Sequence, residues 1–205
     1  MTSLRHNPES ETGPAREPRD AYLDAARDCI LDVGWRRTTL TEVARRAGVS
    51  RMTIYRTWAD MPTLLGDLMT REWAAVVTAE VEATGPDGSA VARIVDGILG
   101  TVRGLRRNEL FVRIVELDPE LILPYLFSRR GRSQELILSI TAEAIRHGQD
   151  AGEIRAGNPV AMARGVLLAV HGFVLSVHTM VDDDETTEHE LDDELATLIT
   201  RTLQP

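Results

Sequence analysis

The stretch that decides the fold is TLTEVARRAGVSRMTIYRTW, residues 39–58. A helix-turn-helix needs a small residue in its first helix, where the second helix approaches closely, and a turn residue that tolerates a positive φ. Ala44 meets the first need, and Gly48, four residues later, meets the second. Apolar residues that hold the two helices together have matching offsets: Val43, Ala47, Val49 and Ile54. The stretch therefore predicts two short helices joined by a sharp turn.

Capping residues delimit these helices and their neighbours. Thr39 opens Thr-Leu-Thr-Glu, a capping box in which its hydroxyl accepts the Glu42 amide while Glu42 reaches back. Ser50 is a plausible N-cap for the second helix, and Asp60 for a fourth. A preceding helix ends at Gly34, as at a C-terminal cap. Four helices are thus expected in this part of the chain.

The charge is distributed unevenly. The 205 residues carry a net charge of −9 from 32 acidic and 23 basic residues, and every basic residue is arginine. Between Gly34 and Trp58, six arginines face one acid, a local balance of +5 that leaves −14 on the remainder. Such asymmetry indicates that one small region meets a polyanion. A solvated helical surface explains the charge alone equally well.

Helical periodicity continues to the end of the chain, so we expect an all-α fold of about nine helices. We expect a flexible tail over 1–18, a helix-turn-helix domain over 19–64 and a second helical domain over 65–205. A helix over about 119–149 is expected to kink near Pro124 or break near Gly131. Apolar residues repeat at heptad spacing over 160–181, and a last helix covers about 187–203.

The segment from about 20 to 68 resembles the N-terminal domain of the TetR family of bacterial transcriptional regulators. The resemblance is carried by Gly34-Trp35, Thr38-Thr39, residues 43–50 (VARRAGVS) and Thr53-Ile54-Tyr55. The rest of the chain matches only in length, in its helical pattern and in the loop Gly152-Glu153-Ile154. The resemblance implies a homodimer whose C-terminal domain binds a small molecule that lowers the affinity for DNA.

The resemblance also implies roles for particular residues. The recognition helix would start at Arg51, so that Arg51, Met52 and Thr53 read base edges in the major groove. Tyr55 matches a family tyrosine that hydrogen-bonds a phosphate. The other expected phosphate contacts are the helix N-termini at Thr39 and Ser50 and the side chains of Arg36, Arg37, Arg45, Arg46 and Arg56. Arg45 and Arg46 would alternatively form a solvated face. The chain departs from the family pattern at Thr57, Trp58 and Met61, the last of which replaces a common lysine.

The second domain would hold the dimer interface and the ligand. Because heptad side chains seat between those of a facing helix, the expected interface consists of Leu167, Val170, Val174, Val177, Val181, Leu195 and Leu198. The stripe would alternatively pack within its own subunit. The expected ligand pocket consists of Trp73, Phe111, Glu116, Tyr125, Phe127, His147, His171 and Phe173, although its aromatic residues also suit a core. Arg129, Arg130 and Arg132 form a second basic cluster, which we interpret as a solvated loop.

The sequence contains no hydrolase, metalloprotease or nucleotide-binding motif, so we expect neither an enzyme nor a cofactor. We also expect no metal site. The single cysteine, Cys29, and the lack of a long apolar run favour a cytoplasmic protein without a membrane partner. The function that fits is a ligand-responsive repressor acting on a palindromic DNA operator. The alternatives are an activator, or a helical ligand-binding or protein-interaction module that does not bind DNA.

Overall fold

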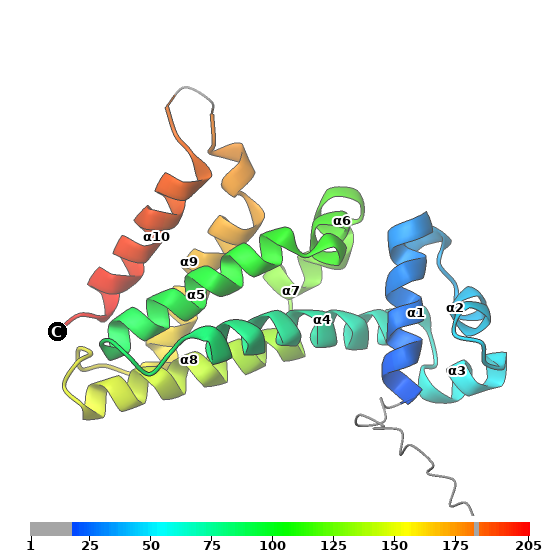
Figure 1. Cartoon of the computed structure of the whole chain (residues 1–205), viewed down its shortest axis with the longest axis horizontal. Helices are drawn as coiled ribbons and strands as arrows, with labels where there is room; N and C mark the ends of the chain where they lie inside the picture. Colours follow the sequence, from blue (N-terminus) through cyan, green and yellow to red (C-terminus); the bar gives the residue numbers. More distant parts are fainter. Residues whose placement is uncertain (1–17, 183–184) are drawn as a thin grey trace, which may run out of the picture.

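The computed structural model describes residues 18–182 and 185–205, and it confirms the all-α fold (Figure 1). The described residues form ten α-helices and three short 3₁₀ helices, where about nine helices were expected. Residues 1–17, which include nearly all of the expected tail, lie outside the described part, and Pro18 already belongs to the first helix.

The N-terminal head consists of α1 (Pro18–Val33), η1 (Trp35–Arg37), α2 (Leu40–Arg46) and α3 (Arg51–Thr57), at one end of the molecule (Figure 1). Both glycines expected at turns have a positive φ, 83° at Gly34 and 67° at Gly48. The Thr39 hydroxyl accepts the Glu42 amide N–H at 3.2 Å. Glu42 does not complete the capping box, because its carboxylate binds Arg45 instead.

Helix α4 (Met61–Ala83) leads from the head into the body, with Asp60 as its N-cap. The domain boundary expected after residue 64 therefore lies inside a continuous helix. The body contains α5 (Ala90–Arg107), α6 (Glu109–Leu117), η2 (Pro119–Leu121), α7 (Leu123–Phe127), α8 (Arg132–Asp150), α9 (Pro159–Leu175), η3 (Val177–Thr179) and α10 (Glu188–Leu203). In Figure 1, α4 and α8 run side by side below α5 and α9. The expected interruption near Gly131 is confirmed, since Gly131 is the N-cap of α8.

The heptad helix expected over 160–181 ends at Leu175, so the prediction was wrong beyond that residue. In a continuing helix the Phe173 carbonyl would accept the N–H of Val177. Instead Arg106 of α5 donates to this carbonyl from Nε at 3.1 Å and from Nη2 at 2.8 Å. The chain turns into η3, where Val177 is buried. A tertiary contact thus ends a helix that the apolar repeat would continue.

Two apolar cores hold the molecule together. One joins α1, α2 and α3 to the first half of α4 and to α6, around Ile30, Trp58 and Leu64. The other joins α5, α8, α9 and α10, around Val102, Ile145 and Leu195. Each fully buried aliphatic side chain contributes roughly 1.5–3 kcal/mol. Because the first core includes α6, the head packs directly on the body.

Candidate functional site

The outer face of α3 is open to solvent. Ser50 caps the helix by accepting the Thr53 amide N–H at 3.1 Å. Ile54 is fully buried and fixes the helix against the head, whereas Met52 is 75% exposed and Tyr55 43% exposed. Arg51 and Arg56 are also exposed, and neither has a carboxylate partner among the described residues. The exposed face of α3 therefore carries charge and hydrogen-bonding groups that the protein itself does not use.

Other arginines on the head have local partners, among them Arg46, whose Nη2 lies 2.5 Å from Asp32 Oδ2. Arg45 pairs with Glu42 at 2.6 Å, and its guanidinium remains largely exposed. Arg37 donates from Nε to the Val33 carbonyl at 2.8 Å, which anchors η1 to the end of α1. The side chains of Arg37 and Arg45 lie on the surface of the head.

Arg36, expected to contact phosphate, lies at the junction between head and body. Its Nη2 is 2.8 Å from Glu120 Oε1, and its Nε is 3.4 Å from Asp118 Oδ1. The hydrogen bond from Arg36 lowers the pKa of Glu120. A contact with DNA would have to compete with these two carboxylates, and no sequence spacing pointed to them, since they lie more than 80 residues away.

Asp67 of α4 forms a second junction, which the sequence analysis did not identify. Its carboxylate accepts a hydrogen bond of 2.7 Å from the indole N–H of Trp58, the residue directly after α3. It also accepts hydrogen bonds from Arg19 of α1 and Arg132 of α8. Burial raises the pKa of Asp67, but the three donors outweigh burial and hold it below the usual value. One buried carboxylate thus links the end of α3 to α1, α4 and α8.

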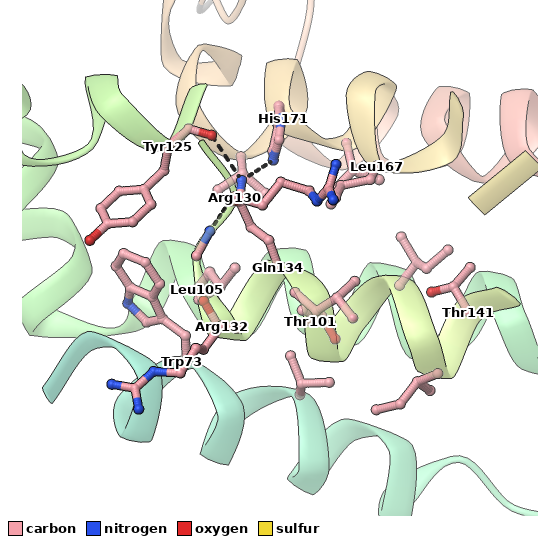
Figure 2. Close-up of a pocket in the computed structure, with 18 of the residues that line it drawn as sticks. Trp73, Thr101, Leu105, Tyr125, Arg130, Arg132, Gln134, Thr141, Leu167 and His171 are labelled. Atoms are coloured by element: carbon pink, nitrogen blue, oxygen red, sulfur yellow. Dashed lines mark hydrogen bonds between the residues drawn. The ribbon is translucent and has the colours of Figure 1, made fainter. Parts of the chain in front are cut away.

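A cavity of about 750 Å³ lies in the body between α4, α5, α7, α8 and α9 (Figure 2). Five of the expected pocket residues line it: Trp73, Phe111, Tyr125, His147 and His171. The other three do not. Phe127 and Glu116 are exposed to solvent, and Phe173 packs against the second apolar core. Trp73 and Phe111 pack edge to face in the wall, 5.6 Å between ring centroids.

Gln134 organises polar groups at one side of the cavity (Figure 2). Its Oε1 accepts the Gly131 N–H at 2.8 Å, so its amide nitrogen faces the Tyr125 carbonyl at 3.2 Å and His171 Nε2 at 3.3 Å. Because an amide nitrogen only donates, His171 Nε2 accepts and the ring proton lies on Nδ1. Burial lowers the pKa of His171, which favours this neutral form.

The expected dimer residues have mixed positions. Leu195 and Val177 are buried within the protomer, and Leu167, Val170 and Val174 line the cavity. Only Leu198 and Val181 are exposed, at 51% and 36%. The exposed face of α9 is formed by different residues, which we call the α9 outer face: Val160, Ala161, Arg164, Gly165, Leu168, Ala169 and Gly172. Most of the repeat on α9 therefore lies on the inward side of that helix within the protomer.

The sequence contained a signal for some of the missed residues. Asp67 lies among the apolar inward positions of α4, between Leu64 and Leu68, where an acid is unusual without a buried partner. Arg129, Arg130 and Arg132, interpreted as a solvated loop, are exposed to solvent, and they also border the cavity. No periodicity could show this, because the loop reaches the cavity only through the fold. In the described ranges, no group of three potential ligands suits a metal ion, and no helix is long and apolar enough to cross a membrane.

Comparisons with known proteins agree with this architecture. The family model described as bacterial regulatory proteins of the tetR family matches residues 23–68. HTH-type transcriptional regulator Mb2274c of Mycobacterium bovis is 34% identical over 154 residues, which cover 75% of this chain and 78% of that protein. HTH-type transcriptional regulator AqdR of Rhodococcus erythropolis is 36% identical over 180 residues, which cover 85% of this chain and 80% of AqdR.

A solved TetR-family transcriptional regulator from a Rhodococcus species superposes with a TM-score of 0.66 at 25% identity, covering 92% of this chain and 99% of that one. The similarity thus extends from the head through the body. The chain belongs to the TetR family and is a helix-turn-helix transcriptional regulator.

Proposed function

We propose that the chain is one subunit of a homodimeric repressor, which a small molecule releases from a two-fold symmetric DNA operator in the cytoplasm. The observation that carries this proposal is the exposed face of α3, where the side chains of Arg51, Met52 and Tyr55 make no hydrogen bond or ion pair with the described residues. Arg51, Met52 and Thr53 in the first turn would read bases in the major groove. Ser50, Tyr55 and Arg56 would bind the phosphates on either side.

The other proposed phosphate contacts are secondary. Thr39 presents the N-terminus of α2, and Arg37 and Arg45 are exposed on the head. Arg36 is a weaker candidate than the sequence indicated, because Glu120 and Asp118 already engage it. We therefore assign Arg36 to the junction between head and body.

A homodimer would bind its DNA operator specifically, because two heads related by a two-fold axis match the two halves of a palindromic sequence. We propose that the subunits meet through the α9 outer face together with Leu198 of α10. Leu168 is 72% exposed, and that face combines Arg164 with the small residues Ala161, Gly165, Ala169 and Gly172. Small residues allow the backbones of two helices to approach closely.

The cavity is the proposed site of the releasing molecule. Its volume of about 750 Å³ lies in the range of drug-sized ligand pockets. Arg132 lines the cavity and also binds Asp67, which binds Trp58 after α3. A bound molecule that moves α8 relative to α4 would thus shift the position of the head, because the Asp67 carboxylate connects them. Reciprocity requires that DNA lower the affinity for the occupant by the same factor.

The test is a mobility-shift assay on DNA selected by the full-length protein from a random pool. A regulator of this kind should show binding that weakens linearly with the logarithm of salt concentration, in proportion to the phosphates contacted. The matched control is the double variant Arg51→Gln/Arg56→Gln, which removes two charges from α3 and should flatten the slope. If selection enriches no sequence, or if the wild-type slope is flat, the non-DNA-binding module replaces this proposal. Reporter transcription then separates repression from activation.

A further inference from the structure

The cavity extends along most of α4. Its lining residues on α4 run from Pro62 to Thr84, a span of about 33 Å at the helical rise of 1.5 Å per residue. A cavity that extends this far along one helix suits an extended chain or a flat molecule lying along α4.

The middle of the cavity is apolar. Side chains from four helices line it there: Met69, Trp73, Val77, Ile94, Ile98, Leu105, Ile137, Ile140, Val166 and Val170. Threonines contribute hydroxyls, but Thr70 and Thr101 donate theirs to backbone carbonyls of their own helices. The central part therefore suits an apolar body.

The charged lining residues are mostly basic, although the protein as a whole is acidic. Four arginines line the cavity, against the single acid Asp60. Three of them, Arg129, Arg130 and Arg132, come from one exposed segment, residues 129–132, which we call the α7–α8 corner. Figure 2 shows that the side chains of Arg130 and Arg132 point in different directions from it. Arg93 lies at the opposite end and donates to the carbonyls of Pro86 and Gly88 in the α4–α5 turn.

The arginines at the α7–α8 corner have too few acidic partners to neutralise them. Arg130 pairs with Glu135 at 2.5 Å. Arg132 shares the carboxylate of Asp67 with Arg19, so two guanidiniums face one negative charge. Arg129 contacts only Tyr125 among the described residues, at 3.4 Å from the hydroxyl and 5.0 Å from the ring centroid. The corner thus keeps positive charge next to an apolar channel, and the N-terminus of α8 adds to the positive potential.

We propose that the cavity binds an elongated amphipathic anion, with its head group on Arg129 and Arg132 at the α7–α8 corner and its apolar body along α4. This inference rests on the proposed role of the cavity as the effector site. A carboxylate head group accepts charged hydrogen bonds from a guanidinium in a fork geometry. At Arg132 it competes with Asp67, and this competition loosens the junction that holds Trp58 behind the recognition helix.

The experiment compares decanoate with decan-1-ol, which share a chain and differ in charge, by titration calorimetry with the full-length protein. Decanoate should bind at least about tenfold more tightly, as expected for a charge-assisted hydrogen bond. Arg129→Gln should remove most of this preference. Arg132→Gln should do the same, and Arg129→Gln carries the test alone if Arg132→Gln does not fold.

Two matched variants define the position of the head group. Arg146→Gln changes an exposed arginine of α8 that pairs with Glu143 outside the cavity lining, and it should leave the preference unchanged. Arg93→Gln should also keep it. The inference is overturned if neither probe binds, if the two probes bind equally, or if Arg93→Gln abolishes the preference while Arg129→Gln retains it.

Failure of this inference is distinguishable from failure of the proposed function. DNA binding by the ligand-free protein is measured without either probe. A wild-type protein that binds selected DNA with a steep salt slope but ignores decanoate keeps its proposed function and loses only the anionic effector.

Discussion

Some residues of α3 pack into the head, and others face solvent. Ile54 is buried, while Arg51 and Tyr55 are exposed on the same helix. A base reader and a phosphate contact differ in what their loss does, because only the base carries sequence information.

We predict that Arg51→Ala and Tyr55→Phe weaken DNA binding in different ways. Loss of the Arg51 fork should cost about 1–3 kcal/mol at one base position and relax selectivity there. Loss of the Tyr55 hydroxyl should cost about 1 kcal/mol on every sequence alike. Quantitative binding to a panel of single-base operator variants measures both, and equal losses across the panel for Arg51→Ala would remove it from base reading.

A second residue-scale prediction concerns pH. Burial lowers the pKa of His171, so the folded protein binds this proton less readily than the unfolded chain does. Stability should therefore be retained above the unfolded pKa of about 6.5 and fall as the pH drops below it toward the folded value. Urea unfolding at pH 7.5 and pH 5.5 measures how much the free energy of unfolding falls between these pH values. This fall should be smaller in His171→Gln than in wild type. Identical losses would contradict the assignment.

Pairs of helices set both the cavity and its link to the head. Helices α4 and α5 approach closely at Gly104, where a Cβ would lie 2.6 Å from Cγ1 of Val76. Helices α4 and α8 are tied to the head through Asp67. The contact at Gly104 and the hydrogen bonds of Asp67 each lead to a testable substitution.

Gly104→Ala should destabilise the protein by about 1–3 kcal/mol, because the stiff Val76 side chain leaves no room for a methyl group. Gly66→Ala on α4 is the matched control. Its added Cβ meets nothing within 4 Å, and the better helix former should stabilise by up to about 1 kcal/mol. Denaturant midpoints measure both, and similar midpoints would show that the close approach is not rigid.

Asp67→Asn should destabilise the protein by about 1–3 kcal/mol and weaken DNA binding beyond the stability effect. The amide keeps an acceptor for Trp58 but loses the charge that Arg19 and Arg132 share. Asp193→Asn, at an exposed carboxylate of α10, serves as control. Unchanged operator affinity in folded Asp67→Asn protein would limit Asp67 to a structural role.

At the scale of the whole molecule, the head and the α9 outer face lie in different parts of the fold, so dimer formation and DNA reading are separable (Figure 1). Operator affinity should nevertheless depend on both, because one head contacts only half of a palindromic site.

Leu168→Glu should produce a folded monomer, because burying the charge of a carboxylate opposes close helix packing across the proposed seam. Phe127→Glu introduces the same charge at a residue that is 80% exposed on α7 and should leave the dimer intact. Analytical ultracentrifugation measures the mass, and a mobility shift measures the affinity. A dimeric Leu168→Glu protein would exclude this face as the seam.

Local patterns predicted the head well. The caps at Thr39, Ser50 and Asp60 and the turn at Gly48 were correct because each depends on residues only three or four positions apart. The cavity was harder, because an aromatic residue such as Phe127 has the same local signal whether it lines a wall or faces solvent. The dimer residues on α9 were predicted from the heptad spacing of apolar side chains. This spacing cannot distinguish an interface between subunits from the wall of a cavity within one subunit.

By itself, the sequence determined the helix-turn-helix, the charge concentrated around it and the all-helical body, since these follow from contacts between near neighbours along the chain. Only the tertiary structure decided where α9 ends, that Arg36 and Asp67 join the head to the body, and that Arg129 and Arg132 line the cavity. These contacts join groups distant in sequence, whose proximity depends on how whole helices pack.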